Sequence, residues 1–211
     1  QKMGLEFGGD LNAYTSFDET VYFLPIPTED KENIDKALTV LSDWAHNATF
    51  DNEEIDKERG VVMEEWRLGR GAAQRMREET WPVVLQGSRY AERLPIGKET
   101  VLQNFKYEAA KRFYADWYRP DLMAIIAVGD FDPAEMEVKI KEYFGSIENP
   151  KKPKERKYYD LPPFKGTRIA VATDDEATGS SIAVGFITPG THKPENTLND
   201  FRKSILSGLY G

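Results

Sequence analysis

Cysteine is absent from the 211 residues, and histidine occurs only at His46 and His192. Without cysteine the chain can form no disulfide bond, thiol nucleophile or cysteine-built zinc site, and it fits cytoplasmic and extracytoplasmic compartments equally. His46 closes a helical pattern, where a lone histidine usually interacts with the helix dipole. We expect His46 to be a helix-end residue and His192, in a Pro/Gly loop, to be exposed to solvent.

Basic residues are outnumbered by acidic ones. The 28 Lys and Arg against 36 Asp and Glu give a formal net charge of −8, with no basic block, which argues against nucleic acid as a partner. No apolar run approaches the length that spans a bilayer. Motifs for serine, phosphate or dinucleotide chemistry are missing, and the Gly-Ser-Ser at 179–181 has no His-Asp partner pattern. The composition, 40% apolar, still allows one substantial core of mixed type.

The strongest pattern in the chain is the helix predicted at 52–70, NEEIDKERGVVMEEWRLGR. Asp51 is a plausible N-cap, and acidic residues crowd the first turn, where the helix dipole favours them. Within this helix Glu58 and Glu65 are seven residues apart, so they lie about 20° apart on one face and about 10 Å apart along the axis. Both carboxylates are therefore expected to point the same way.

Two interpretations of this acidic face are open. An apolar stripe lies close to it, formed by Ile55, Val62 and Trp66. The stripe would place Glu58 and Glu65 at the edge of a core, as a functional pair. Glutamate is also a common surface helix former, so the same residues could be ordinary solvated charge. Helix chemistry alone favours the second interpretation.

The flanking patterns predict an α+β fold with helices layered on a mixed β-sheet. Strands are expected within 5–27, at 121–128, which looks buried on both faces, and at 167–172 and 180–187. Helices are expected at 29–47, 71–80, 106–118, 133–144 and 197–210. The small-residue strand Asn12, Ala13, Tyr14, Thr15 suits a sheet edge, where free backbone groups could pair with an extended peptide; a plain hairpin is the alternative.

Four segments, in this order, resemble the pitrilysin/insulinase family of zinc metallopeptidases, in particular bacterial zinc-protease members. They are GGDLNAYTSFDETVYFLPIP, EEIDKERGVVMEEWR, RYAERLPIGKE and FYADWYRPDLMAIIAVGDFDP. The resemblance implies a mitochondrial processing peptidase-like metallohydrolase domain. Residues 1–150 would be part of the N-terminal peptidase domain, 151–166 a linker within it, and 167–211 its remaining strands and a truncated helix.

The resemblance also implies a site. The family binds zinc through an inverted HxxEH motif and a glutamate on a later helix, and Glu65 matches that third ligand. Glu58 matches a supporting acid that does not bind the metal. Asn12 and Ala13 match the substrate contacts of the edge strand formed by residues 12–15. A peptide or unfolded polypeptide would be the substrate, and a second homologous domain or subunit the partner.

This chain has no HxxEH, so two zinc ligands and the general base are missing from it. Both ends look cut, and we expect the two histidines upstream, with the chain alone inactive and without zinc. The alternative is a non-catalytic peptide-binding partner subunit of the same family. Glu58 and Glu65 would then be partly buried like charges without a cation, which argues against this alternative. A purely structural α+β domain does not explain four matching segments. Bacterial relatives give a weak lean to the periplasm.

Overall fold

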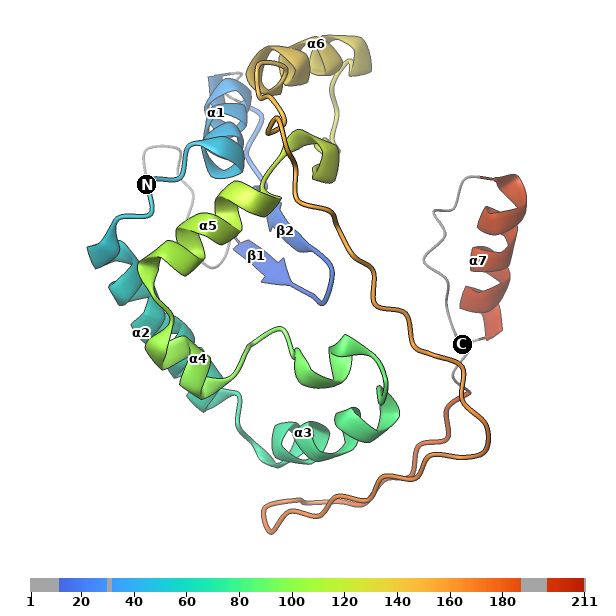
Figure 1. Ribbon diagram of the computed structural model, residues 1–211. Coiled ribbons are helices and arrows are strands. Elements are labelled where there is room, and N and C mark those ends of the chain that lie inside the picture. Colours follow the sequence, from blue (N-terminus) through green and yellow to red (C-terminus); the bar gives the residue numbers. More distant parts are fainter. Residues whose placement is uncertain (1–11, 30–31, 187–196, 211) are drawn as a thin grey trace. The chain divides into compact units, whose positions relative to one another are not determined.

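The computed structural model describes residues 12–29, 32–186 and 197–210 (Figure 1). Its chain divides into two compact units. Unit 1 contains Gln1–Gly71 and Arg93–Arg156, and unit 2 contains Ala72–Glu92 and Lys157–Gly211. His192 lies outside the described residues.

Unit 1 begins with a hairpin of β1 (Asn12–Thr15) and β2 (Thr20–Phe23). The strands are antiparallel, and Asn12 is opposite Phe23. Ser16 N donates to Glu19 O at 2.9 Å and closes the turn between them. Strands were predicted in this region, and the hairpin confirms them. It is the only sheet among the described residues, so the expected larger mixed sheet is not present in that part of the chain.

Helices make up most of the rest of unit 1. They are α1 (Glu32–His46), α2 (Asn52–Leu68), α4 (Glu99–Asn104), α5 (Tyr107–Trp117), α6 (Pro133–Phe144) and the 3₁₀ turn η2 (Pro120–Leu122). Helix α1 packs against α6, and helix α2 packs against α4. The core is small: Ala37, Leu38, Ile55 and Met136 are its buried apolar residues among those described. His46 ends α1, as predicted.

An aromatic cluster adds to the apolar packing of unit 1. Tyr114 on α5 lies between two other rings, with centroids 4.8 Å from Phe50 and 4.5 Å from Tyr118. The hydroxyl of Tyr114 donates to Trp44 O at 2.7 Å. Tyr22 extends the cluster to β2, because its ring centroid lies 5.7 Å from that of Trp44. These contacts join the hairpin to α1 and α5.

The prediction of a buried strand at 121–128 is wrong for this structure. Residues 120–122 form η2, and 123–128 have no helix or strand assignment. Ile126 is 83% exposed and Val128 91% exposed. A strand needs a backbone partner along its edge, and no described residue pairs with this segment.

Unit 2 contains α3 (Ala72–Val84), the 3₁₀ turn η1 (Arg89–Glu92) and α7 (Leu198–Tyr210). Helix α3 is longer than the predicted 71–80, because Pro82 lies inside its last turn rather than ending it. The strands predicted at 167–172 and 180–187 are not observed in the described residues through 186. Their apolar side chains are exposed, and no ladder partner accompanies them in this part of the chain.

Candidate functional site

Helix α2 carries the two predicted acidic residues. Asp51 occupies the N-cap position in an extended conformation, but its side chain makes no capping hydrogen bond, which corrects that part of the expectation. Gly69 ends the helix, and its N–H donates to Glu65 O at 2.9 Å. The helix is unbroken from Asn52 to Leu68, so Glu58 and Glu65 share one face as the seven-residue spacing requires.

The side chains of Glu58 and Glu65 are both exposed, although Ile55 beside them is buried. Neither carboxylate forms an ion pair or side-chain hydrogen bond with any residue that the structure describes. Other acids of the helix do: Glu64, for example, pairs with Arg67 at 2.7 Å. Burial of like charges at Glu58 and Glu65 therefore does not count against the non-catalytic partner subunit.

The donor chemistry of this face fits only part of a zinc site. A carboxylate free of protein partners is a suitable zinc ligand. Zinc sites use three or four protein ligands, drawn from His, Cys, Asp and Glu. Within residues 12–29, 32–186 and 197–210, no group of three or more His, Asp or Glu side chains could hold a metal ion. Glu65 can thus supply one donor, and Glu58 a neighbouring negative charge, but the described residues do not complete the site.

The alternation of hydrogen bonds along the hairpin shows which backbone groups of β1 do not pair with β2. Ser16 bonds to Glu19, and antiparallel ladders alternate bonded and non-bonded pairs. Tyr14 and Asn12 therefore face β2, while Ala13 and Thr15 direct their N–H and C=O groups to the outer edge. The Ala13 N–H agrees, because it donates to Asn12 Oδ1 at 2.8 Å. All four β1 residues are exposed, and among the described residues only β2 pairs with β1.

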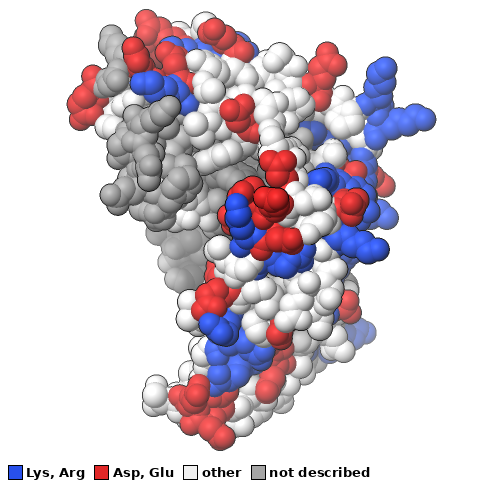
Figure 2. Space-filling view, turned by 90° about the vertical axis from the view of Figure 1, so that its left-hand side faces the viewer, with Lys and Arg blue, Asp and Glu red and all other residues white. Residues whose placement is uncertain are grey.

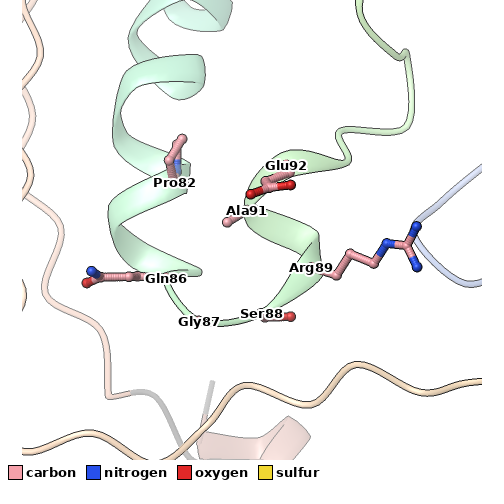
Figure 3. Close-up of a pocket in the computed structure, with 7 residues that line it drawn as sticks. All are labelled: Pro82, Gln86, Gly87, Ser88, Arg89, Ala91 and Glu92. Carbon is pink, nitrogen blue, oxygen red and sulfur yellow. The ribbon is translucent and has the colours of Figure 1, made fainter.

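Two cavities were not foreseen from the sequence. The first lies at the turn after α3 and has a volume of about 480 Å³. It is lined by Pro82, Gln86, Gly87, Ser88, Arg89, Ala91 and Glu92 (Figure 3). The second, of about 420 Å³, lies in unit 1 over the aromatic cluster. Its lining is Tyr22, Phe50, Phe105, Ala109, Ala110, Phe113, Tyr114 and Tyr118.

In Figure 3 the Arg89 side chain points away from the first cavity. Its guanidinium instead donates to the hydroxyl of Tyr159 at 2.5 Å and lies over that ring. Ser88 is buried, and its hydroxyl donates to Tyr159 O at 3.0 Å. These contacts fix the turn after α3 to the extended segment beyond residue 157. The cavity is therefore part of how unit 2 packs, and no cationic group is directed into it.

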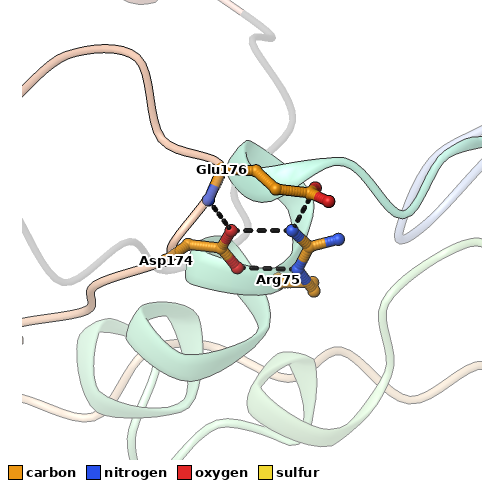
Figure 4. Close-up of polar contacts among 3 residues, drawn as sticks. All are labelled: Arg75, Asp174 and Glu176. Atoms are coloured by element: carbon orange, nitrogen blue, oxygen red, sulfur yellow. Dashed lines mark hydrogen bonds and ion pairs between the residues drawn. The ribbon is translucent and has the colours of Figure 1, made fainter.

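Unit 2 contains an ion-pair cluster of Arg75, Asp174 and Glu176 that was not predicted from the sequence (Figure 4). Arg75 donates from Nε and Nη2 to the two carboxylate oxygens of Asp174, at 2.6 and 2.7 Å, and from Nη2 to Glu176 at 2.6 Å. The hydrogen bonds from Arg75 lower the pKa of Asp174 to about 2. The residues are 99 and 101 positions apart, and no local motif could have indicated their contact.

Charges of both signs occur together on the visible face of the molecule, and Figure 2 shows acidic and basic side chains intermingled there. Many of the charges are paired, including Glu137 with Lys141 and Asp35 with Lys139. Of the helices in the described ranges, none is both long and apolar enough to cross a membrane.

Comparisons with known proteins bear on the site. The family model described as "Insulinase (Peptidase family M16)" matches residues 3–80, and "Peptidase M16 inactive domain" matches residues 104–210. A "Zinc protease PQQL-like" of Arabidopsis thaliana is 34% identical over the whole chain. This chain spans only 22% of that relative's length.

Solved structures agree with these matches. The first half of the periplasmic protease PqqL from Escherichia coli aligns with a TM-score of 0.70 and 38% identity, over 76% of this chain and 34% of that one. The ferredoxin protease FusC, solved with Arabidopsis ferredoxin, aligns with a TM-score of 0.71 and 30% identity, over 78% of this chain and 18% of that one. Two family models together span both the hairpin with α2 and the region from α5 to α7. The chain belongs to the M16 family of peptidases, the insulinase family.

Proposed function

We propose that the full-length protein is a zinc-dependent endopeptidase and that Glu65 is one of its zinc ligands. The observation that carries this proposal is the pair of exposed carboxylates of Glu58 and Glu65, on one face of α2 in an M16 chain, for which the described residues supply no partner. An exposed carboxylate with no other partner is available to a metal, whereas a paired one such as Glu64 is not.

Glu58 has a supporting role in this proposal. Lying two turns before Glu65, it is near enough to stabilise the cation electrostatically and to orient groups around it without binding it. Bound zinc would act as a Lewis acid and lower the pKa of a coordinated water. The described residues lack two further ligands and a general base, and we assign those roles to an HxxEH motif outside this sequence.

The substrate is proposed to be a peptide or unfolded polypeptide held as an added strand along β1. Ala13 and Thr15 direct backbone donors and acceptors outward, and pairing with them would supply affinity without strong dependence on side chains. Asn12 and Tyr14 flank these groups. The relative FusC was solved with ferredoxin, which indicates that a substrate of the family can be a specific protein as well as a short peptide.

The remaining assignments follow from the family. We place residues 1–150 in the N-terminal peptidase domain, 151–166 as a linker within it and 167–211 as its further elements, in a mitochondrial processing peptidase-like α+β fold. Its mixed sheet would be completed by strands from the rest of the protein, which would cover the exposed apolar segment at 123–128. A second homologous domain is the proposed partner. The periplasm is the proposed compartment, because PqqL from Escherichia coli is periplasmic.

A non-catalytic, peptide-binding partner subunit is the second candidate. Half of the chain matches a model whose description includes the words "inactive domain", and the present sequence has no HxxEH. Such a subunit would retain the outer edge of β1 but not bind zinc. It differs from the first candidate in two measurable properties, zinc content and chelator-sensitive peptide cleavage.

The test uses the full-length protein, its Glu65→Gln variant and the matched control Glu64→Gln. We expect wild-type protein to contain zinc and to cleave unfolded polypeptide until a chelator is added. Glu65→Gln should lose most of both, while Glu64→Gln should retain them because Glu64 pairs with Arg67 on the surface. Zinc and full activity in Glu65→Gln would refute the ligand assignment. Peptide binding without any cleavage or zinc would favour the partner subunit.

A further inference from the structure

Arg59 follows Glu58 directly on α2, but its environment is different. Consecutive helical residues are rotated by about 100°, so Arg59 faces away from the line that joins Glu58 and Glu65. Its side chain is only 17% exposed, whereas Glu58 is exposed to solvent. Arg59 is therefore placed to contact the protein while its neighbour faces outward.

The guanidinium of Arg59 closes the end of the short helix α4. Nη1 donates to Leu102 O, and Nη2 donates to Phe105 O at 2.9 Å. The last carbonyls of a helix lack partners within it and attract positive charge, so a guanidinium fork suits this position. The cation also stacks on Phe105, with Cζ 3.9 Å from the ring centroid. One side chain of α2 thus satisfies two backbone groups and one ring beyond it.

A second contact connects the same part of α2 to α5. Asp56 lies 3.5 Å from Arg59 Nε, and it accepts a hydrogen bond from the Tyr107 hydroxyl at 2.6 Å. Tyr107 is the first residue of α5. Asn52 lies one turn before Asp56 on α2, and its Oδ1 accepts a hydrogen bond from Lys111 of α5 at 2.9 Å. Three polar side chains of α2 therefore contact α4 or α5, and Arg59 makes the most buried of these contacts.

Apolar packing alone defines the rotation of α2 weakly. Ile55 is its buried residue, and Val62 and Trp66 are only partly covered. A polar contact with fixed geometry constrains rotation about the helix axis more strongly than one apolar contact, because hydrogen bonds are directional. The fork of Arg59 must meet two carbonyls at once, and a small rotation of α2 would break at least one bond.

We propose that Arg59 is a positioning residue that fixes the rotation of α2 and thereby the direction of the Glu58 and Glu65 carboxylates. This inference rests on the proposed function, because it takes that face to be the one that serves the metal. Arg59 does not touch the metal or substrate in this assignment. It acts through α2, from a different face than its acidic neighbour Glu58.

The experiment compares Arg59→Met, Arg59→Lys, Glu65→Gln and the control Arg67→Met in the full-length protein. Arg67 is on the same helix, 73% exposed, and pairs only with Glu64 among the described residues. Zinc affinity is measured by chelator competition, and kcat and KM are determined separately by steady-state kinetics. Thermal unfolding shows that each variant folds. Deuterium uptake of residues 99–107 and of α2, measured after zinc removal, reports on the contact between Arg59 and the end of α4.

For Arg59→Met we expect zinc affinity and kcat to fall about tenfold or more, as for other groups that orient a metal ligand, with KM changed much less. Arg59→Lys retains the charge but not the fork, so its values should lie between those of the wild type and Arg59→Met. Deuterium uptake should rise at the end of α4 in Arg59→Met. Arg67→Met should match the wild type in every measurement.

Two results separate the inference from the proposal on which it rests. If Glu65→Gln loses zinc but folded Arg59→Met binds zinc within about twofold of wild type, positioning by Arg59 is refuted and the ligand assignment stands. If Glu65→Gln retains zinc, the ligand assignment fails. Deuterium uptake then decides whether Arg59 holds α2: unchanged uptake in Arg59→Met overturns the contact, and increased uptake at α4 and along α2 supports it.

Discussion

Asp174 accepts two hydrogen bonds from the guanidinium of Arg75, one on each carboxylate oxygen. This paired geometry is the strongest form of a carboxylate–guanidinium contact, and a third bond joins Arg75 to Glu176. Figure 4 shows both acids converging on the single guanidinium. The cluster joins α3 to the turn at residues 174–177, where Ala177 N donates to Asp174 O at 3.0 Å.

The stability of unit 2 should depend on pH through Asp174. The hydrogen bonds from Arg75 lower its pKa from 3.8 to about 2, so folding favours the ionised form. The contribution is complete above 3.8 and is lost as the pH falls through about 2. We expect Asp174→Asn to increase amide exchange in α3 near neutral pH, and the difference from wild type to narrow at low pH.

Glu137→Gln is the control for that measurement. Glu137 pairs with Lys141 on α6, and both side chains are more than half exposed. An exposed pair contributes little to stability, so the control should exchange like the wild type at every pH. A constant difference between Asp174→Asn and wild type across the acid range would contradict the assignment of the titration to Asp174.

Glu58→Gln should weaken zinc binding without abolishing it. Removing a charged group beside a metal ligand typically costs about 10–100-fold in metal affinity or activity, less than loss of the ligand itself. Chelator competition on the full-length protein measures the affinity, with Glu64→Gln as the surface control on the same helix. An affinity equal to that of the wild type would assign Glu58 to ordinary surface charge.

Ala13→Pro should impair peptide binding, because proline removes the N–H that Ala13 directs to the outer edge of β1. Edge strands tolerate proline at such positions, so the hairpin should persist. Thr20→Pro is the matched control, since Thr20 begins β2 and by the same alternation directs its N–H to the opposite edge. We expect KM for a peptide substrate to rise in Ala13→Pro only. Equal KM values in both variants would refute pairing at β1.

Two glycines should respond to alanine in opposite directions. Gly60 lies in the interior of α2 with open space around it, so Gly60→Ala should stabilise the protein by about 0.5–1 kcal/mol. Gly87 has φ +91°, and a Cβ there would lie 2.6 Å from Pro162 Cγ. Gly87→Ala should destabilise by about 1–3 kcal/mol. Chemical denaturation measures the change in unfolding free energy for both variants. A change of the same sign in Gly60→Ala and Gly87→Ala would contradict the two local geometries.

Signals confined to a few residues predicted structure well. Asp132-Pro133 and Gly145 correctly indicated α6, where Asp132 Oδ1 accepts from the N–H groups of Ala134 and Glu135. The acidic first turn and the seven-residue spacing likewise predicted α2 and its face. Such features depend on contacts within one turn of a helix, which the sequence contains in full.

Predictions that required distant partners were less successful. The apolar run at 121–128 predicted a buried strand, but burial and pairing depend on what packs against the run, and the described residues supply no partner strand. The helix predicted at 71–80 continues to Val84, and the last turn of α3 accommodates Pro82. Two interpretations of the acidic face were open, the edge of a core and solvated charge, and the structure has the side chains of Glu58 and Glu65 exposed.

The sequence by itself determined the family, the helix that carries Glu58 and Glu65, and the short strand with Asn12 and Ala13, because each rests on local spacing or on residues in fixed order. The tertiary structure decided which side chains hold those elements. Arg59 reaches carbonyls 43 and 46 residues away, and Arg75 reaches Asp174 across 99. Contacts of that separation depend on how the chain folds back on itself, and no periodicity of the residues encodes them.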